Sequence, residues 1–372
     1  MKYLELIKKH LSKFLLGIML ILIAYIAIFR QDIAIHQYDK AVGMYYIYKG
    51  DKALKKQELQ DAIKYYRAGL EKYPNHYNAW FNLGNLYVLY EDYFAATDAY
   101  AKAIELNDKY MLARMNLGII SAEKIGDFDE AINQYKKVID TKRRGVYIPF
   151  VYNSGKSIKL NKAIAYYNMG HAYRQKAIYL PKEDFIKYRE YLKKSAEAYE
   201  NALNIYKQDY DTSYNLALVY HLLKDYNKAG KNYCKAIQTD FMSFEAHYNL
   251  AVLLKHLKFY NEALEEMEKA TMLITSSKTP YSRSMYVLDV LNDISVSAFM
   301  QANEEKENEK ENLKNSDTNN QKEDIKSSIK YNEDDVAIGL THGKIVINDK
   351  LDEIINEKLK HCPEELFKEE EY

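Results

Sequence analysis

The 372-residue sequence contains few of the residues that interrupt helices or cross-link chains: 5 prolines, 13 glycines and 2 cysteines. Proline and glycine are unfavourable inside helices, so their scarcity is typical of long helices rather than of short strands and turns. The two cysteines, Cys234 and Cys362, lie far apart in segments of different character. They support neither a disulfide framework nor a cysteine metal site, and we expect Cys234 to be a small buried side chain.

The sequence also lacks an excess of either charge, because 53 Lys and Arg residues balance 53 Asp and Glu residues. A neutral chain produces no overall field that attracts a phosphate backbone, and no local basic patch stands out. We therefore expect no nucleic-acid partner. The 9 histidines are scattered singly rather than paired as metal ligands are, so we expect no metal and no other cofactor.

Motifs that carry catalysis are missing as well. Gly155, Lys156 and Ser157 match the end of a phosphate-binding loop, but Phe150 stands where such a loop needs its first glycine. No set of Ser, His and an acidic residue is evident, and no long non-helical stretch is available for a catalytic domain. We expect a protein that is not an enzyme; the alternative is an intrinsic transferase or hydrolase.

One long apolar run is present near the N-terminus. Residues 14–29 (FLLGIMLILIAYIAIF) carry no charge, and we predict a transmembrane helix over residues 14–30, with Lys13 and Arg30 reaching the membrane interface. The alternative is a cleaved signal peptide. The nearby alanines lack the second small residue that a cleavage site requires, which favours the uncleaved anchor.

Basic residues flank this run unevenly. The nearby basic residues are Lys2, Lys8, Lys9 and Lys13 before the run, and Arg30 and Lys40 after it. Positive charge is retained on the cytoplasmic side of membranes, so we expect residues 1–13 to lie in the cytoplasm. The sequence thus predicts a single-pass membrane protein whose remaining chain lies in the periplasm or outside the cell.

A period of 34 residues runs through the rest of the chain. Leu83 and Gly84 recur 34 residues later as Leu117 and Gly118. Gly84 leaves room for the second helix of its pair to approach, and we expect Tyr100 to fill the gap between pairs. One copy carries the pattern at Trp80, Leu83, Gly84, Tyr87, Ala96, Tyr100 and Ala103. This pattern resembles that of the tetratricopeptide repeat family. The resemblance implies an all-α, right-handed superhelical solenoid of helix pairs that binds other proteins.

We predict six copies of this unit, three over residues 40–140 and three over residues 162–275. A linker loop over residues 141–161 divides them, because the helical period is lost there and Gly, Pro and β-branched residues gather. The fourth copy carries an insertion of helical composition, so we expect lengthened helices there. After the repeats, we predict a capping helix over 280–301, a disordered low-complexity linker over 302–330 and a small hairpin and helix over 331–372.

An asparagine directly precedes the Leu-Gly, Leu-Ala or Met-Gly pair of five first helices. In the family that the sequence resembles, this position faces the groove, and some members bind the backbone of an extended peptide there through the amide donor and acceptor. Alternatively, these amides are solvated or bonded to a neighbouring turn. The candidate peptide-binding residues, with their aromatic and basic neighbours, are Asn82, Asn116, Asn168, Asn215, Asn249, Phe81, Tyr167, Arg174, Tyr214, Tyr248 and Lys255.

These features together predict a membrane-anchored scaffold or adaptor. It would bind extended peptide segments in a concave groove during the assembly of envelope or membrane complexes. One alternative is an accessory subunit that positions a catalytic partner, such as glycan-handling or secretion machinery. Another is a homo-oligomer in which the C-terminal segment of one copy fills the groove of its neighbour.

Overall fold

The computed structural model describes the helical region and short pieces on either side of it. The described residues are 13, 15–25, 28, 30–142, 147–148, 152–276, 290, 293–298, 300–308 and 358–367. The predicted capping helix (280–301) and C-terminal segment (331–372) therefore lie partly outside the described residues. Residues 302–308, at the start of the predicted disordered linker, are helical, and the rest of that linker lies outside the described residues.

Residues 15–25, near the N-terminus, are helical and carry exposed apolar side chains such as Leu15 and Ile21. The membrane helix predicted over residues 14–30 falls partly on residues outside the described part of the chain. In the part that the structure describes, no helix combines the length and the apolar character needed to cross a bilayer.

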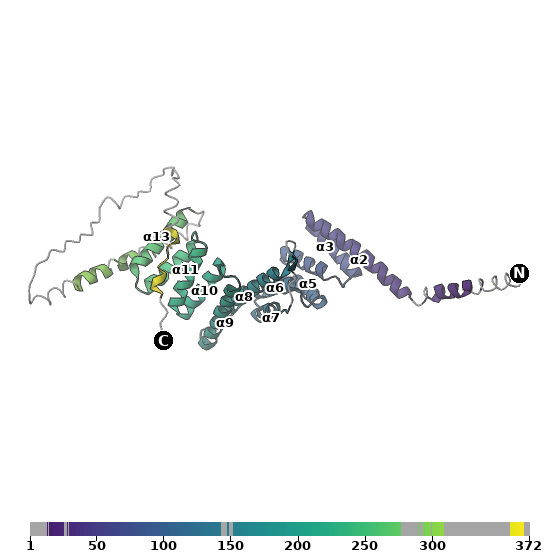
Figure 1. The fold of residues 1–372 in the computed structure, drawn as a ribbon, viewed down its shortest axis with the longest axis horizontal. Helices are drawn as coiled ribbons and strands as arrows, with labels where there is room; N and C mark the ends of the chain where they lie inside the picture. Colours follow the sequence, from purple (N-terminus) through teal and green to yellow (C-terminus); the bar gives the residue numbers. More distant parts are fainter. Residues whose placement is uncertain are drawn as a thin grey trace, which may run out of the picture. The chain divides into compact units, whose positions relative to one another are not determined.

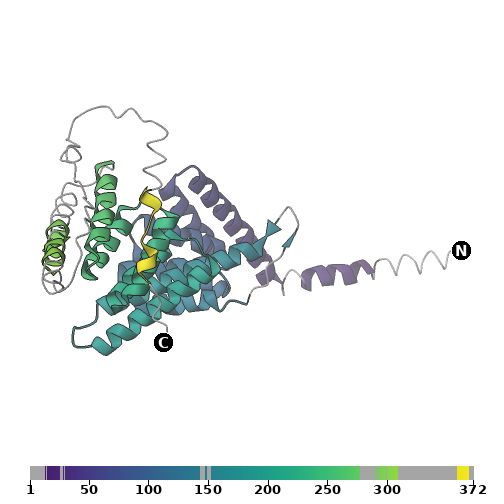
Figure 2. The ribbon, with the colours of Figure 1, turned by 60° about the vertical axis from the view of Figure 1, so that its left-hand side comes forward.

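The chain divides into two compact units, Met1–Ala172 and Tyr173–Tyr372. In the first unit, α2 packs against α3, α4 against α5, and α6 against α7, as Figures 1 and 2 show. The elements of this unit are α2 (Gln31–Lys55), α3 (Leu59–Lys72), α4 (Tyr77–Leu89), α5 (Tyr93–Leu106), α6 (Met111–Ile120), the π-helix η1 (Ser121–Ile125) and α7 (Phe128–Ile139). Each pair buries the small and bulky residues of the 34-residue pattern.

Short turns and capping side chains define the helix pairs. Glu91 ends the turn after α4 in a left-handed conformation (φ 59°), and the next residue, Asp92, accepts a 3.1 Å hydrogen bond from the backbone N–H of Ala95. That bond satisfies one of the free N–H groups at the start of α5. Asp127 caps α7 in the same way, by accepting a 3.0 Å bond from the N–H of Glu130. These polar turns keep the two helices of a pair adjacent.

The third pair contains one more residue between its helices than the second pair does. The structure accommodates it as the π-helical turn η1, which Gly126 ends with a left-handed φ of 81°. A π-turn holds one extra residue per turn without breaking the helix. The extra residue therefore lengthens the first helix of this pair, and the 34-residue packing resumes after it.

A two-residue antiparallel ladder follows α7. Its strands are β1 (Tyr147–Ile148) and β2 (Tyr152–Asn153), and Ile148 pairs with Tyr152. α8 (Ser154–Ile178) begins directly after it, so residues 154–161 of the predicted loop are helical. These residues include good helix formers such as Lys and Leu and no proline, so nothing in them opposes the extension of α8.

The boundary between the two units falls inside α8. The insertion in the fourth copy lengthens both helices of its pair, because α8 has 25 residues and α9 has 21, against 14 in α10. In the second unit, α10 packs against α9 and α11, and α12 packs against α11 and α13. The remaining elements are α9 (Phe185–Ile205), α10 (Tyr210–Leu223), α11 (Tyr226–Thr239), α12 (Phe244–His256), α13 (Tyr260–Ser276) and the 3-10 helix η3 (Glu364–Leu366).

Candidate functional site

Each helix pair of the first unit packs a tyrosine of its second helix against a glycine of its first helix. A Cβ atom on Gly84 would lie 2.7 Å from Cε1 of Tyr100, and a Cβ atom on Gly118 would lie 2.6 Å from Cε1 of Tyr135. These separations are shorter than van der Waals contact, so only glycine allows the ring to come this close. The close approach brings the tyrosine hydroxyl beside the first helix, where the candidate asparagines lie.

The hydroxyl of Tyr66 joins two consecutive helix pairs. It donates a 2.6 Å hydrogen bond to Oδ1 of Asp51 on α2 and accepts a 3.2 Å bond from Nδ2 of Asn82 on α4. Burial, and to a smaller extent the hydrogen bond to Asp51, raise the pKa of Tyr66. The phenol therefore stays protonated and continues to donate. Asn82, a candidate for peptide binding, thus also fastens one repeat to the next.

The same arrangement recurs in the following repeat. The Tyr100 hydroxyl donates a 2.7 Å hydrogen bond to Oδ1 of Asn85. The amide nitrogen of Asn116 on α6 lies 3.3 Å from that hydroxyl and 2.9 Å from the same Oδ1 atom. Burial raises the pKa of Tyr100, whereas the bond from Asn116 lowers it to a smaller extent. Asn82 and Asn116 therefore occupy equivalent positions in one repeated network.

The second unit uses its asparagines differently. The amide nitrogen of Asn249 donates to the Tyr214 hydroxyl at 2.7 Å and to the backbone oxygen of Glu245 at 2.9 Å. Asn215 donates to the backbone oxygen of Asp211, one turn earlier in its own helix, at 2.8 Å. In four of the five candidate asparagines, at least one amide N–H therefore contributes to the fold rather than being free for a ligand.

The remaining candidates are only partly available to a ligand. Tyr167 and Asn168 lie half-buried on α8, within the first unit. Lys255 on α12 forms an ion pair with Asp293. The ammonium of Lys255 is thus already neutralised by an acidic side chain of the same unit.

Half-buried aromatic rings accompany the asparagines on the first helices of the first unit. The rings of Tyr77 and Phe81 on α4 each lie 5.1 Å from the ring of Tyr110, which precedes α6. Edge-to-face and tilted pairs at this separation stabilise each other and hold the rings in place. All three rings are half-buried, so part of each ring remains exposed to a ligand.

Corresponding positions of the second unit are aromatic too. Tyr210 and Tyr214 on α10 stack at 5.7 Å, and Phe244 and Tyr248 on α12 lie 5.5 Å apart. All four rings are half-buried. α4, α10 and α12 therefore each carry aromatic rings at their first and fifth positions, next to a candidate asparagine, whereas α6 carries Met111 and Met115 at these positions.

Arg174 on α8 belongs to the aromatic cluster of the second unit. Its Nε is buried and has no hydrogen-bond acceptor among the described residues. Its positive charge lowers the pKa of Tyr214 and Tyr233, although burial is the larger effect on both and raises their pKa. A buried N–H group without an acceptor is costly, so Arg174 can gain from an oxygen supplied by a bound chain.

These groups suit recognition of a polypeptide better than chemistry on a substrate. The candidate residues on the first helices offer apolar rings, amide oxygens and the guanidinium of Arg174. In the part of the chain that the structure describes, no group of three or more His, Cys, Asp or Glu residues is arranged to hold a metal ion.

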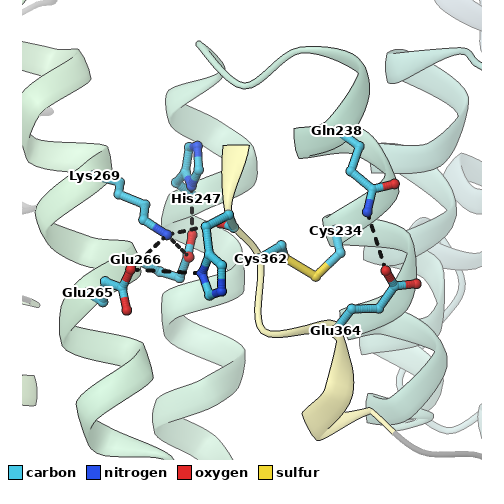
Figure 3. The surroundings of a disulfide bond; sticks show 9 residues. Cys234, Gln238, His247, Glu265, Glu266, Lys269, Cys362 and Glu364 are labelled. Atoms are coloured by element: carbon cyan, nitrogen blue, oxygen red, sulfur yellow. Dashed lines mark hydrogen bonds and ion pairs between the residues drawn. A yellow bond between two sulfur atoms is a disulfide. The ribbon is translucent and has the colours of Figure 1, made fainter. Parts of the chain in front are cut away.

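The sequence-based expectation of unpaired cysteines is wrong. Cys234 on α11 and Cys362 near the C-terminus form a disulfide, with their Cα atoms 5.6 Å apart and a sequence separation of 128 (Figure 3). The fold brings the two segments together, and no spacing rule connects cysteines at such a distance. The even number of cysteines was the only indication in the sequence.

A buried ionic cluster beside the disulfide also escaped sequence reasoning. Nδ1 of His247 lies 2.6 Å from Oε2 of Glu266, and Nε2 of the same ring lies 3.1 Å from the backbone oxygen of Phe241. The ammonium of Lys269 lies 2.6 Å from the other oxygen of Glu266 (Figure 3). The side chains of His247, Glu266 and Lys269 are each at most 1% exposed. Charged residues within amphipathic helices are ordinarily solvated, so nothing in the helical pattern predicts this cluster.

Comparison with known families matches two parts of the chain to tetratricopeptide repeat models. One model covers residues 49–110, and a second covers residues 210–241 and 244–275. Superkiller complex protein 3 from Homo sapiens is 28% identical over 113 residues, which is 30% of this chain. The chain spans only 7% of the length of that relative.

Solved structures with a similar arrangement include bacterial proteins. MamA is 21% identical, with a TM-score of 0.43, over 54% of this chain and 92% of that one. PilF of Pseudomonas aeruginosa is 15% identical, with a TM-score of 0.46, over 64% of this chain and 95% of that one. PilW, described as a type IV pilus biogenesis factor, is 16% identical, with a TM-score of 0.46, over 66% of this chain and 98% of that one.

Proposed function

The chain contains tetratricopeptide repeats, and we propose that it is a non-catalytic scaffold whose first helices bind extended segments of partner proteins. The observation that carries this proposal is the repeated combination of half-buried aromatic rings with an asparagine on the first helices of both units. Phe81 and Tyr248 represent this combination in the first and second unit.

The asparagines would contribute their oxygen atoms rather than their N–H groups. In Asn82, Asn116 and Asn249, Nδ2 already donates within the protein, and Oδ1 accepts no hydrogen bond from a described residue. An extended peptide presents backbone N–H groups that such oxygens can accept, whatever its side chains are. Each hydrogen bond would contribute about 0.5–1.5 kcal/mol net.

Aromatic rings would supply the rest of the affinity. A ring held in place by its neighbours loses little conformational entropy when an apolar side chain packs on it. In the second unit, Arg174 would add a charge-assisted hydrogen bond to a carbonyl or carboxylate oxygen of the partner. We therefore propose ligands with alternating apolar side chains and little further sequence requirement.

We further propose that the repeats lie outside the cytoplasm, anchored by residues 14–30, and serve the assembly of envelope or membrane complexes. Two observations support this location. Four lysines precede the apolar run, as expected for a cytoplasmic N-terminus. The disulfide between Cys234 and Cys362 fits an oxidising compartment, because cytosolic thiols are kept reduced.

Site-specific crosslinking tests the binding face. A photoreactive phenylalanine analogue placed at Phe81 or Tyr248 should crosslink to partner proteins in cells of the source organism. The matched control carries the same photoreactive residue at Phe94, on the second helix α5. Phe94 is also aromatic and is 76% exposed, but it lies outside the first helices. Equal or higher yield of the same products from position 94 would contradict binding along the first helices.

Two substitutions of Asn116 separate its proposed binding role from its structural role. Asn116→Ala removes both the donor and the acceptor, whereas Asn116→Asp removes the donor and keeps an acceptor oxygen. Both should destabilise the first unit, because both lose the bonds to Asn85 and Tyr100. Only the alanine variant should also lower the yield of the crosslink from position 81. If the folded Asn116→Ala variant crosslinks from position 81 as efficiently as the chain with Asn116, then Asn116 does not contribute to peptide binding.

A further inference from the structure

A short C-terminal segment lies on the second helices of the last two repeats. This segment, residues 358–367, is called the strap here, and its contact surface on α11 and α13 is called the seat. Figure 3 shows the strap passing along these helices, with its cysteine turned toward α11. Leu359 is 3% exposed and Phe367 is 1% exposed, so the strap buries apolar side chains at both ends.

The seat has a notch that takes an aromatic ring. Gly230 on α11 lies directly beneath Phe367, and a Cβ atom at position 230 would lie 2.2 Å from Cε1 of that ring. No side chain other than hydrogen leaves room for this contact. Gly230 and Phe367 are both buried.

The seat also has a polar anchor for the backbone of the strap. The buried ammonium of Lys269 donates a 3.0 Å hydrogen bond to the backbone oxygen of His361, in addition to its ion pairs with Glu266 at 2.6 Å and Glu265 at 3.2 Å. An ammonium has three N–H donors, so the strap supplies the last acceptor. The carbonyl that binds Lys269 belongs to the residue just before Cys362.

The other contacts between strap and seat are weak. Gln238 and Glu364 form an exposed hydrogen bond of 3.3 Å, and the ion pairs of Lys358 with Glu268 and of His361 with Glu265 are 3.9 Å and 4.0 Å long. Exposed pairs of this kind contribute little. The disulfide closes a loop of 128 residues, whose closure is entropically unfavourable without a covalent bond. We therefore expect the strap to remain bound to the seat when the disulfide is formed and to dissociate readily when it is reduced.

We propose that the seat is a peptide-docking site separate from the first helices, that the strap is its resident ligand, and that the redox state of the disulfide sets its occupancy. In the oxidised protein the strap fills the seat. After reduction the strap exchanges with solvent, and the notch at Gly230 and the donor of Lys269 become available. A peptide that fits the seat reproduces two contacts of the strap. The backbone carbonyl at the position of His361 accepts the hydrogen bond from Lys269, and an aromatic ring at the position of Phe367, five residues after the cysteine, packs on Gly230.

The reducing step is an ordinary exchange with a dithiol. One thiolate of a protein dithiol, or of dithiothreitol, attacks Sγ of Cys362, because Cys234 is fully buried and Cys362 is partly exposed. The S–S bond breaks and Cys234 leaves as a thiolate, which takes up a proton. The second thiol of the reductant then loses its proton and attacks the mixed disulfide, so Cys362 leaves as a thiol and the reductant becomes a disulfide. Two electrons and two protons pass to the protein.

A synthetic strap peptide tests the proposal on the full chain. The probe is a fluorescent peptide of residues 358–367 with Ser at position 362, so that it binds without a covalent bond. We expect no binding to the oxidised chain, and saturable binding to the dithiothreitol-reduced chain and to the Cys362→Ser variant. The matched control peptide, with Phe367→Ala, should bind at least about tenfold more weakly because it leaves the notch empty.

Hydrogen exchange provides an independent readout. The backbone amides of residues 358–367 should exchange at least about tenfold faster after reduction, while those of α10 and α12 keep their rates. Retention of these rates also shows that the reduced unit remains folded. Unchanged protection of the strap after reduction, together with no peptide binding, would overturn the proposal. A disulfide-linked dimer in place of the monomer on a non-reducing gel would overturn closure within one chain.

Discussion

The amide nitrogen of Asn116 lies 2.9 Å from Oδ1 of Asn85, which directly follows Gly84 in the preceding repeat. This contact joins two helix pairs through side chains that the 34-residue pattern places on the same side of the first unit. It means that the asparagines of the first unit stabilise the stacking of repeats, whatever they bind. Stability must therefore be measured alongside binding in every asparagine variant.

The hydroxyl of Tyr100 should contribute measurably to the stability of the first unit. Tyr100→Phe removes the bond to Asn85 and the bond from Asn116, and we expect a loss of about 1–2 kcal/mol in the free energy of unfolding. The matched control is Tyr135→Phe at the same position one repeat later, where the hydroxyl has no hydrogen-bond partner among the described residues. Urea unfolding should show a change below about 0.5 kcal/mol for that control.

The contact between Gly118 and Tyr135 should make Gly118→Ala destabilising. The new Cβ would meet the ring at 2.6 Å, and overpacking of this kind costs about 1–3 kcal/mol, more than the roughly 1 kcal/mol that alanine gains over glycine in a helix. Thermal or urea unfolding measures the difference. In the double variant with Tyr135→Leu, the total loss should be smaller than the sum of the single losses. If the two losses in the free energy of unfolding simply add, the Cβ at position 118 does not clash with the ring of Tyr135.

Glu266 should be indispensable to the buried cluster of the second unit. Glu266→Leu leaves the imidazole of His247 and the ammonium of Lys269 buried without their shared carboxylate, and we expect a loss of about 3–5 kcal/mol. Glu268→Leu, two residues later on the exposed side of α13, removes only a 3.9 Å surface pair and should cost less than about 1 kcal/mol. Chemical unfolding at neutral pH measures the free energy of unfolding of both variants. Similar losses for Glu266→Leu and Glu268→Leu would contradict the prediction.

His221 should make the second unit less stable in acid. Burial, with a smaller contribution from the neighbouring His256, lowers the pKa of His221 in the folded chain. The unfolded chain therefore binds the proton more tightly, and stability is lost as the pH falls through the ordinary histidine value of about 6.5. Well above that pH, His221 is neutral in both the folded and the unfolded chain and no longer affects the stability. NMR titration of the His221 ring should give a pKa below that of a free histidine.

A variant isolates the contribution of His221 from that of the other histidines. His221→Gln should flatten the fall in stability between pH 8 and pH 5, because it removes one group that takes up a proton on unfolding. His256→Gln is the comparison, since His256 is exposed and acts on His221 only through its charge. An identical pH dependence for the unmodified chain and His221→Gln would refute the linkage.

The helix pairs could be predicted from sequence because their cause is local. The recurrence of Leu83 and Gly84 as Leu117 and Gly118 indicates small residues that let the two helices of a pair approach. The sequence did not show that the ring of Tyr100 packs on Gly84 within one pair rather than between pairs.

The extra residue of the third pair is visible in the sequence, since one more residue separates Gly118 from Ala131 than separates Gly84 from Ala96. Its form, the π-turn at Ser121–Ile125, is not, because a turn and a π-bulge accommodate one residue equally well in a sequence pattern.

The candidate binding face could be predicted only in part. The register identified Asn82, Asn116 and Phe81 as neighbours on the first helices, and these residues do share networks or clusters there. The register did not show that the amide N–H groups are used by tyrosine hydroxyls. That depends on how closely Tyr66 and Tyr100 approach the first helix of their own pair, a property of helix packing rather than of spacing.

The sequence by itself determined that this chain forms stacked helix pairs, because each pair is specified by contacts among residues close together along the chain. Only the tertiary structure decided that Cys234 meets Cys362, that Phe367 fills the notch at Gly230, and that Lys269 is buried with Glu266. The strap contacts join segments about a hundred residues apart, and the buried ion cluster needs two helices and the strap to exclude water. No periodicity in a sequence encodes contacts of that range.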